Sequence, residues 1–160
     1  MSATRAKPEP GAARLELAVQ KAASAAGLPA QRELRRWLEA ALEQSAAITV
    51  RFVGAAEGRR LNRRYRGRDY ATNVLSFNYG RSGEAQALVG DIVLCAPVLR
   101  GEARAQRKPL TAHIAHLTVH GALHLQGHDH HNARAAARME TLERRILARL
   151  GFPDPYAGDA

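Results

Sequence analysis

The stretch HLTVHGALHLQGHDHH occupies residues 116–131 and contains six of the seven histidines in this chain. His120 and His124 lie four residues apart, so an α-helix would place both rings on one face, one turn apart. Gly127 follows shortly after, and glycine can adopt the positive φ that ends a helix in a left-handed turn. The chain can then turn back and bring His130 to the same point. Three neutral imidazoles with an open fourth position are typical of a catalytic zinc site.

The remaining histidines are weaker candidates, because a single histidine on an apolar helix is most often a core or surface residue. His116 precedes His120 by four residues, so a His116–His120 pair is also geometrically possible. His116 and His124 would lie about 12 Å apart along a helix axis and cannot both bind one ion. Only His120 with His124 leads into the glycine turn. We therefore predict His120, His124 and His130 as the metal ligands, and we assign His116 to helix packing or to contacts behind the ligands.

The spacing H-x3-H-x5-H resembles the metzincin protease signature H-E-x-x-H-x-x-G-x-x-H, with one departure. Gly121 stands where that signature carries its general-base glutamate, so peptide hydrolysis by that route is not expected. The segment His120–His130 is more similar to H-G-x-L-H-L-x-G-x-D-H, the pattern of the YbeY family of bacterial endoribonucleases. His128 stands where that family usually has tyrosine, and it keeps a polar ring at this position.

A second segment, RRYRGRDYATNVLSF at residues 63–77, is rich in arginine. Runs of arginine are commonly solvated basic faces. Here the glycine and the aspartate that follow Arg66 predict a turn just before a strand, and loops at strand ends are where functional sites are often built. A guanidinium can hold a phosphodiester through two hydrogen bonds and offset charge in the transition state. Arg63 and Arg68 are candidates for additional phosphate contacts.

Residues 61–77 also resemble the YbeY pattern L-N-x-x-Y-R-x-x-D-x-P-T-N-V-L-S-F, with Ala71 in place of the proline. The resemblance implies that Arg66 is a functional residue of the family type. It also makes Asn73 and Ser76 candidates for contacts with the substrate.

Composition limits the class of protein. The chain has 160 residues, enough for one domain with a sizeable core, and its hydrophobic fraction of 46% fits a soluble globular protein. A net charge of +9 favours a polyanionic partner, nucleic acid before an anionic membrane, although arginine-rich chains can be basic without such a partner. Cys95 is the only cysteine, which is consistent with a reducing cytoplasm. No apolar run approaches the ~20 residues of a membrane span, and no secretory signal is recognisable.

Periodicity predicts a single domain over residues 14–152, between a disordered tail at 1–13 and a short tail at 153–160. The expected strands and helices follow one another in the order β-α-β-α-β-β-α-α-α. This order predicts one mixed sheet of about four strands covered by helices, an α/β (α+β) class. The YbeY fold is of that type. Asp91, inside an apolar strand, is expected to make a structural hydrogen bond. The expected strands are residues 15–19, 47–53, 72–77 and 88–94, the expected helices are 29–44, 54–65, 97–107, 110–126 and 132–150, and a polar loop is expected at 81–86.

These observations, with the resemblance, predict a metal-dependent endoribonuclease that cleaves single-stranded RNA in rRNA maturation and ribosome quality control. One zinc ion per chain would lower the pKa of bound water toward ~7, although imidazole also suits Ni, Cu and Fe. Either the resulting hydroxide or an RNA 2′-hydroxyl would attack the phosphodiester while Arg66 holds it. The expected partners are precursor rRNA and the ribosome or its small subunit. Two alternatives stay open: a metallohydrolase acting on a peptide or small molecule, and a non-catalytic ribosome-binding factor with a structural metal.

Overall fold

The computed structural model describes residues 13–157, and its elements follow the predicted order, with the predicted α/β class confirmed as one four-stranded mixed sheet covered by helices. Nearly all of the predicted tail at 1–13 lies outside the described residues, as do residues 158–160. The strands are β1 (Leu15–Lys21), β2 (Ala46–Val53), β3 (Val74–Ser82) and β4 (Ala87–Cys95). The helices are α1 (Gln31–Ala41), α2 (Ala55–Arg66), α3 (Ala96–Ala105), α4 (Leu110–Leu125) and α5 (Ala133–Arg149).

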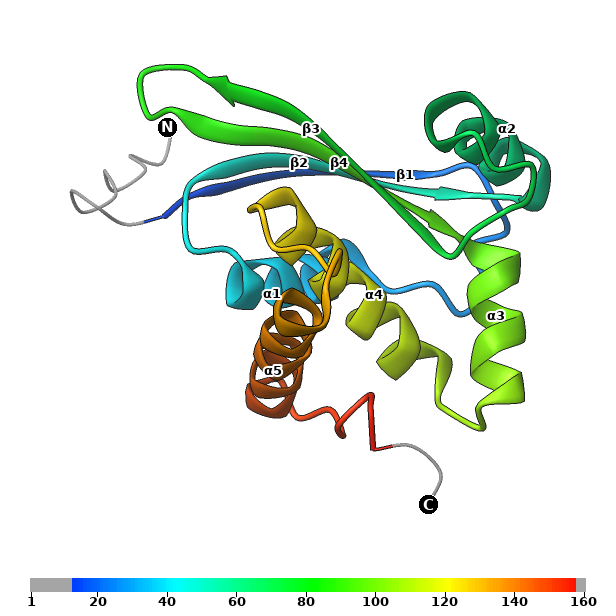
Figure 1. The fold of residues 1–160 in the computed structure, drawn as a ribbon. Helices are drawn as coiled ribbons and strands as arrows, with labels where there is room; N and C mark the ends of the chain where they lie inside the picture. Colours follow the sequence, from blue (N-terminus) through cyan, green and yellow to red (C-terminus); the bar gives the residue numbers. More distant parts are fainter. Residues whose placement is uncertain (1–12, 158–160) are drawn as a thin grey trace, which may run out of the picture.

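The sheet has the strand order β1-β2-β4-β3. β1 pairs in parallel with β2, and β2 in parallel with β4, whereas β3 is antiparallel to β4 through a short hairpin connection. Helices α1, α4 and α5 lie on one side of the sheet, while α2 lies on the opposite side near one end (Figure 1). The helix with the histidines therefore lies within the helical layer that covers the sheet.

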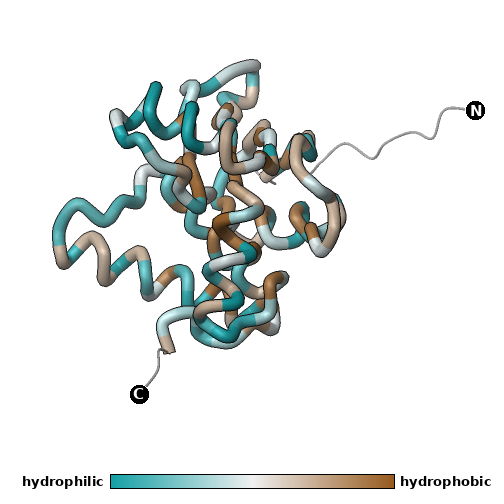
Figure 2. Tube along the Cα trace, turned by 90° about the vertical axis from the view of Figure 1, so that its right-hand side faces the viewer, coloured by the Kyte–Doolittle hydropathy of each residue, from teal (hydrophilic) through white to brown (hydrophobic). Residues whose placement is uncertain are grey.

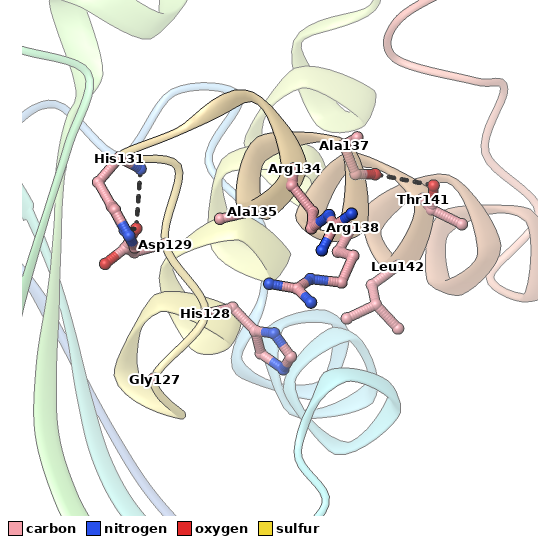
Figure 3. A pocket seen from close by; sticks show the side chains of 10 residues that line it. All are labelled: Gly127, His128, Asp129, His131, Arg134, Ala135, Ala137, Arg138, Thr141 and Leu142. Atoms are coloured by element: carbon pink, nitrogen blue, oxygen red, sulfur yellow. Dashed lines mark hydrogen bonds and ion pairs between the residues drawn. The ribbon is translucent and has the colours of Figure 1, made fainter.

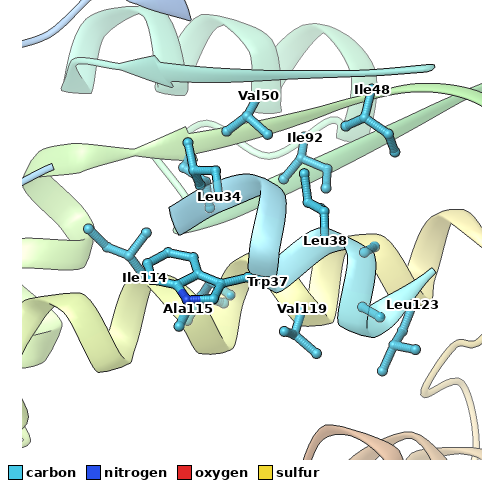
Figure 4. Close-up of a cluster of buried hydrophobic side chains, with 14 of the residues drawn as sticks. Leu34, Trp37, Leu38, Ile48, Val50, Ile92, Ile114, Ala115, Val119 and Leu123 are labelled. Carbon is cyan, nitrogen blue, oxygen red and sulfur yellow. The ribbon is translucent and has the colours of Figure 1, made fainter. Parts of the chain in front are cut away.

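The main core lies between this helical layer and the sheet, and the most hydrophobic segments gather at the centre of the molecule (Figure 2). Leu34, Trp37 and Leu38 recur at helical spacing on α1, and each is at most 1% exposed. They face Ile114 and Val119 of α4, which are fully buried (Figure 4). Because α4 contacts α1, α3, α5 and two strands, its side chains are held on nearly every side.

Most boundaries differ from the predictions by at least one residue, and those of α1, α2 and β3 have clear physical or functional consequences. Helix α1 ends at Ala41 because Leu42 already has an extended backbone, with φ −89° and ψ 129°. Helix α2 continues through Arg66, where a turn was predicted, and ends at Gly67, whose φ of +70° is left-handed. β3 begins at Val74 and continues to Ser82, so it takes up the first two residues of the predicted loop. Arg66 is thus the last residue of α2, and the turn begins at Gly67, one position later than predicted.

The predicted structural hydrogen bond of Asp91 is confirmed. The Tyr79 hydroxyl donates to Asp91 Oδ2 at 2.8 Å, across the β3–β4 pair. Loss of hydration around the hydroxyl and this hydrogen bond raise the pKa of Tyr79 to about 12, so the hydroxyl keeps its proton. Among the described helices, none is both long and apolar enough to cross a membrane.

Candidate active site

Three histidine rings come together at the C-terminal end of α4. His120 and His124 lie one turn apart on the helix, and His130 comes from the loop that follows it. The ring centroids are 6.2 Å apart for His120 and His124, 5.7 Å for His120 and His130, and 5.9 Å for His124 and His130. The structure therefore brings all three predicted ligands into one cluster.

The loop that carries the third ring is held at both ends. Gly127 has φ +96°, and the backbone N–H of His128 donates to the carbonyl oxygen of Leu123 at 3.1 Å, so α4 ends in the glycine turn that its sequence predicts. At the other end, Asn132 caps α5, and its Oδ1 accepts the backbone N–H of Ala135 at 2.8 Å. These two anchors return the chain toward α4.

A buried carboxylate lies behind the first ring. Glu143 of α5 is 0% exposed, and its Oε1 lies 2.6 Å from His120 Nδ1. The Tyr156 hydroxyl donates to the other carboxylate oxygen, and His116 Nε2 lies 3.6 Å from Oε1. Burial by itself would raise the pKa of Glu143, but the hydrogen bonds from His116, His120 and Tyr156 outweigh it and lower this pKa to about 2. The carboxylate accepts the Nδ1 proton of His120, which leaves Nε2 as the nitrogen that can bind a metal.

The surroundings of the second ring, His124, favour its neutral form. Burial lowers the pKa of His124, and the nearby His120, His130 and Arg66 lower it further. Because a metal binds the deprotonated imidazole nitrogen, this environment favours the form that could coordinate an ion.

The three rings lie slightly further apart than they would around a bound metal ion. Three imidazoles bound to one zinc ion at about 2.0–2.1 Å would place their ring centroids about 5 Å apart. The observed separations of 5.7–6.2 Å are somewhat larger, and within residues 13–157 no three His, Cys, Asp or Glu side chains are already arranged to hold a metal ion. The difference is about 1 Å, which small side-chain rotations would close. The donor set and the carboxylate behind His120 therefore fit a metal site.

A hollow of about 470 Å³, here called the histidine hollow, connects the three rings to α2 and β3. Four of the five other predicted site residues line it, namely Arg66, Arg68, Asn73 and Ser76. Arg63 is exposed on α2 and is not among the lining residues. The remaining residues that line the histidine hollow were not predicted as site residues, and they are Asn62, Tyr70, Thr72, Val74 and Leu75.

Arg66 also lines the hollow and is anchored to β3. Its Nη2 donates to the carbonyl oxygen of Ser76 at 2.9 Å, and its Cζ lies 5.7 Å from the centroid of the Phe77 ring. A guanidinium carries five N–H donors in a fixed plane, so one bond to the backbone of β3 leaves further donors for an anion. This residue can therefore hold a phosphate at a defined place relative to the imidazoles.

Asn73 is positioned by a chain of hydrogen bonds from α3 and α4. Its Nδ2 lies 3.1 Å and 3.3 Å from the two carboxylate oxygens of Glu102, and His113 Nε2 lies 3.0 Å from Glu102 Oε1. Because His113 is only 4% exposed, it orients this chain from inside the protein and does not face the hollow.

Gly121 lies where α4 packs closely on the sheet. A Cβ atom at this position would lie 3.0 Å from Ile92 Cγ2 and 3.2 Å from Ser76 Oγ. The Ser76 hydroxyl also donates to the Gly121 carbonyl oxygen, at 3.4 Å. The helix packs closely on the sheet here, so the general-base glutamate of the metzincin signature would require the side chains of Ile92 and Ser76 to shift.

Two residues of the site were missed by the sequence analysis. Glu143 lies in the buried stripe of α5 with Met139, Ile146 and Leu147, and a carboxylate in such a stripe requires a partner, which could have marked it. Tyr156 gave no such signal, because it belongs to a short polar segment near the end of the chain that the sequence analysis assigned to a tail. In the structure its ring lies 5.2 Å from that of His116.

The fold and the hollow define a small single-sheet α/β protein, in which imidazoles and a guanidinium share one hollow on a basic surface. A family model described as Endoribonuclease YbeY matches residues 19–151. The chain therefore belongs to the YbeY family of endoribonucleases, and the predicted family and enzyme class, a hydrolytic RNA endonuclease, are confirmed.

Curated relatives and one solved structure agree with this assignment. An Endoribonuclease YbeY from Aromatoleum aromaticum is 57% identical over 155 residues, which cover 95% of this chain and 99% of the relative. An Endoribonuclease YbeY from Thiobacillus denitrificans is 56% identical over 145 residues, which cover 91% and 98%. The solution structure of a protein from Thermotoga maritima aligns with a TM-score of 0.52 at 19% identity, covering 89% of this chain and 98% of that one, and supports the fold alone.

Proposed function

We propose that this endoribonuclease cleaves single-stranded RNA in the histidine hollow, with one zinc ion per chain held by His120, His124 and His130. The observation that carries the proposal is the shared hollow, which is lined by three imidazoles and by an arginine that is anchored on β3. Zinc bound there would act as a Lewis acid and make a hydroxyl group acidic near neutral pH. The Nδ1 contact from His120 to Glu143 supports this ligand set, because carboxylates commonly orient metal-binding histidines in this way.

The protein's own residues would place and stabilise the phosphodiester. Arg66 would bind two phosphate oxygens and offset the negative charge that develops as the bond breaks. Asn73 and Ser76, both lining the hollow, would contact the same nucleotide, and Arg68 would contact a neighbouring phosphate. Tyr70 is 54% exposed at the hollow, so its ring is available for stacking on an unpaired base.

We infer that the substrate is precursor rRNA on the ribosome or its small subunit, in the cytoplasm, as the family resemblance implies. The net charge of +9 and the single buried cysteine support an RNA partner and a reducing compartment. Purified small subunits that carry precursor rRNA should be cleaved more efficiently than the same rRNA free in solution. Equal cleavage of both, with no cosedimentation of the protein with subunits, would limit the proposal to RNA and remove the ribosome from it.

A circular single-stranded RNA tests the reaction itself, because only an endonuclease can open it. The metal-loaded protein should linearise the circle, should leave a fully paired RNA duplex intact, and should lose the activity after dialysis against a chelator. Zinc added back should restore the activity. Full activity in a sample that elemental analysis shows to be free of zinc would contradict the assignment of zinc, and an uncut circle would contradict the proposed function.

A further inference from the structure

A second hollow of about 670 Å³ lies beside the loop that carries His130. One wall is formed by loop residues 127–129 and 131, and the other by the first three turns of α5 (Figure 3). We call it the arginine groove, after Arg134 and Arg138. His130 lines the histidine hollow while its neighbours Asp129 and His131 line the arginine groove, so one short loop borders both spaces.

The groove presents two positive charges that the rest of the described chain does not neutralise. Arg134 and Arg138 lie four residues apart on one face of α5, and both are exposed. Within residues 13–157, neither guanidinium makes an ion pair or a side-chain hydrogen bond. The nearby carboxylate of Asp129 is already engaged, because it accepts the backbone N–H of His131 at 2.8 Å and contacts the ring of the same residue (Figure 3). The groove is therefore suited to an anion.

The remaining residues that line the groove are suited to a flat apolar group. Leu142 and two alanines of α5 give it an apolar side, and the half-buried ring of His128 extends toward the arginines (Figure 3). A nucleotide combines both features, since its base can stack on a ring while its phosphate binds arginine. A free inorganic anion would make no use of the apolar wall.

We propose that the arginine groove binds the single-stranded RNA that flanks the cleaved bond, with its phosphates on Arg134 and Arg138 and a base against His128. This inference rests on the proposed function, because it needs RNA in the histidine hollow on the other side of the loop. RNA in the histidine hollow that continues past the loop at residues 127–131 would enter the groove, because this loop borders both spaces. The groove thus extends the substrate site by at least one nucleotide, without selecting a particular base.

The same helix offers a matched control. Arg145 and Arg149 are also exposed, also four residues apart, and each lies eleven residues after one of the groove arginines. Eleven residues are close to three turns, so the control pair lies on nearly the same face but about 16 Å further along the axis. The double variants Arg134→Ala/Arg138→Ala and Arg145→Ala/Arg149→Ala remove equal charge, and both should keep the melting temperature of the parent.

The experiment measures the affinity of the metal-loaded proteins for labelled single-stranded RNA at several salt concentrations, at 4 °C and before product appears on a gel. The groove variant should bind about tenfold more weakly, and the slope of log affinity against log salt should fall by about 1.4, or 0.7 for each lost phosphate contact. The control variant should change less than twofold. An equal loss in both variants would show that only general electrostatics acts and would overturn the inference.

RNA length gives a second readout. When the RNA is extended on either side of the cleavage site, the parent and the control variant should gain affinity from extension on one side, and the groove variant should not. If the groove variant gained affinity like the control, the inference would be overturned even though the parent cleaves circular RNA. If the parent bound RNA but did not cleave it, the proposed function would fail while the groove could still be tested. If the groove variant lost affinity for an acidic peptide that the parent binds, but bound RNA as well as the parent does, the groove would be assigned to a protein partner and the inference would be overturned.

Discussion

The two halves of α4 carry histidines at similar helical spacing but hold them differently. In the N-terminal half, His113 contacts Glu102 and His116 lies 3.3 Å from the Tyr156 hydroxyl. The remaining nitrogen of each of these rings, Nδ1, is buried and has no hydrogen-bond partner within residues 13–157. In the C-terminal half, His120 and His124 line the histidine hollow. Helical spacing alone therefore does not tell which histidines are metal ligands. The surroundings of the rings distinguish them, because the free nitrogens of His113 and His116 are buried whereas the rings of His120 and His124 line the histidine hollow.

The largest expected difference between the two halves is in metal content. His124→Ala removes a proposed ligand and should reduce the bound metal from about one ion per chain to nearly none, with loss of cleavage. His116→Ala should keep the ion, because this ring faces Tyr156 and the carboxylate behind the site. Elemental analysis of the purified variants gives the answer. Equal metal in His124→Ala and the parent, or loss in His116→Ala alone, would mean that the wrong half of the helix has been assigned.

The next effect concerns Arg66, which lines the same hollow as the C-terminal half of α4. Arg66→Ala should keep its metal and fold, yet its single-turnover cleavage rate should fall about 100-fold, the scale for one positioned transition-state donor. Arg66→Lys should recover little, because an ammonium lacks the planar fork of donors. Arg63→Ala is the control, since Arg63 lies on the same helix outside the hollow. Similar bound rates for Arg66→Ala and Arg63→Ala would remove the special role of Arg66.

A smaller effect should follow from changing the carboxylate behind His120. Glu143→Gln keeps the shape of the side chain but removes its charge, so the Nδ1 proton of His120 loses its strong acceptor. Metal affinity should fall by about 10- to 100-fold, the range for partners of ligating histidines. Glu39→Gln removes the same charge at an exposed position on α1, where the carboxylate pairs with Arg35, and should leave the affinity unchanged. A competition titration with a coloured chelator measures both variants, and unchanged affinity in Glu143→Gln would separate this carboxylate from the metal site.

The smallest effect is expected for the N-terminal half of α4, where a substitution should change stability but not metal binding. His113→Ala leaves the Glu102 carboxylate without its buried partner, so the free energy of unfolding should fall by about 1–3 kcal/mol. The metal content should be that of the parent, because His113 lies outside the histidine hollow. Urea denaturation and elemental analysis of the same sample test both statements. Loss of metal without loss of stability would reverse the proposed contrast between the two halves.

Local features of this fold could be predicted from the sequence because their causes are local. The glycine turn at Gly127 depends only on a residue that tolerates positive φ after a helical pattern, and the structure has it. The element order follows from periodicity in the same way. The end of α2 was misplaced by one residue because the arginine-rich segment has no apolar stripe to follow, so only the left-handed Gly67 marks where the helix ends.

The parts of the site that were missed depend on contacts between distant segments. Glu143 meets a ring that lies 23 residues earlier, and Tyr156 meets the same carboxylate from beyond the last helix. No pattern within one helix carries that information, because α5 has to dock on α4 before the two side chains meet. The four arginines of residues 63–68 are likewise equal in sequence, and only the direction of α2 relative to β3 sends Arg66 into the hollow and leaves Arg63 outside.

The three rings differ in what holds them, since two come from the most enclosed helix and the third from the loop between Gly127 and Asn132. Local opening of a short loop costs far less free energy than unfolding a buried helix. With the proposed ligands, His130 could therefore detach and rebind while α4 stays folded, and a bound ion would leave through a state with two ligands. The lifetime of the bound ion would then follow the opening rate of the loop, so a fully folded protein would exchange its ion with the surrounding metal supply.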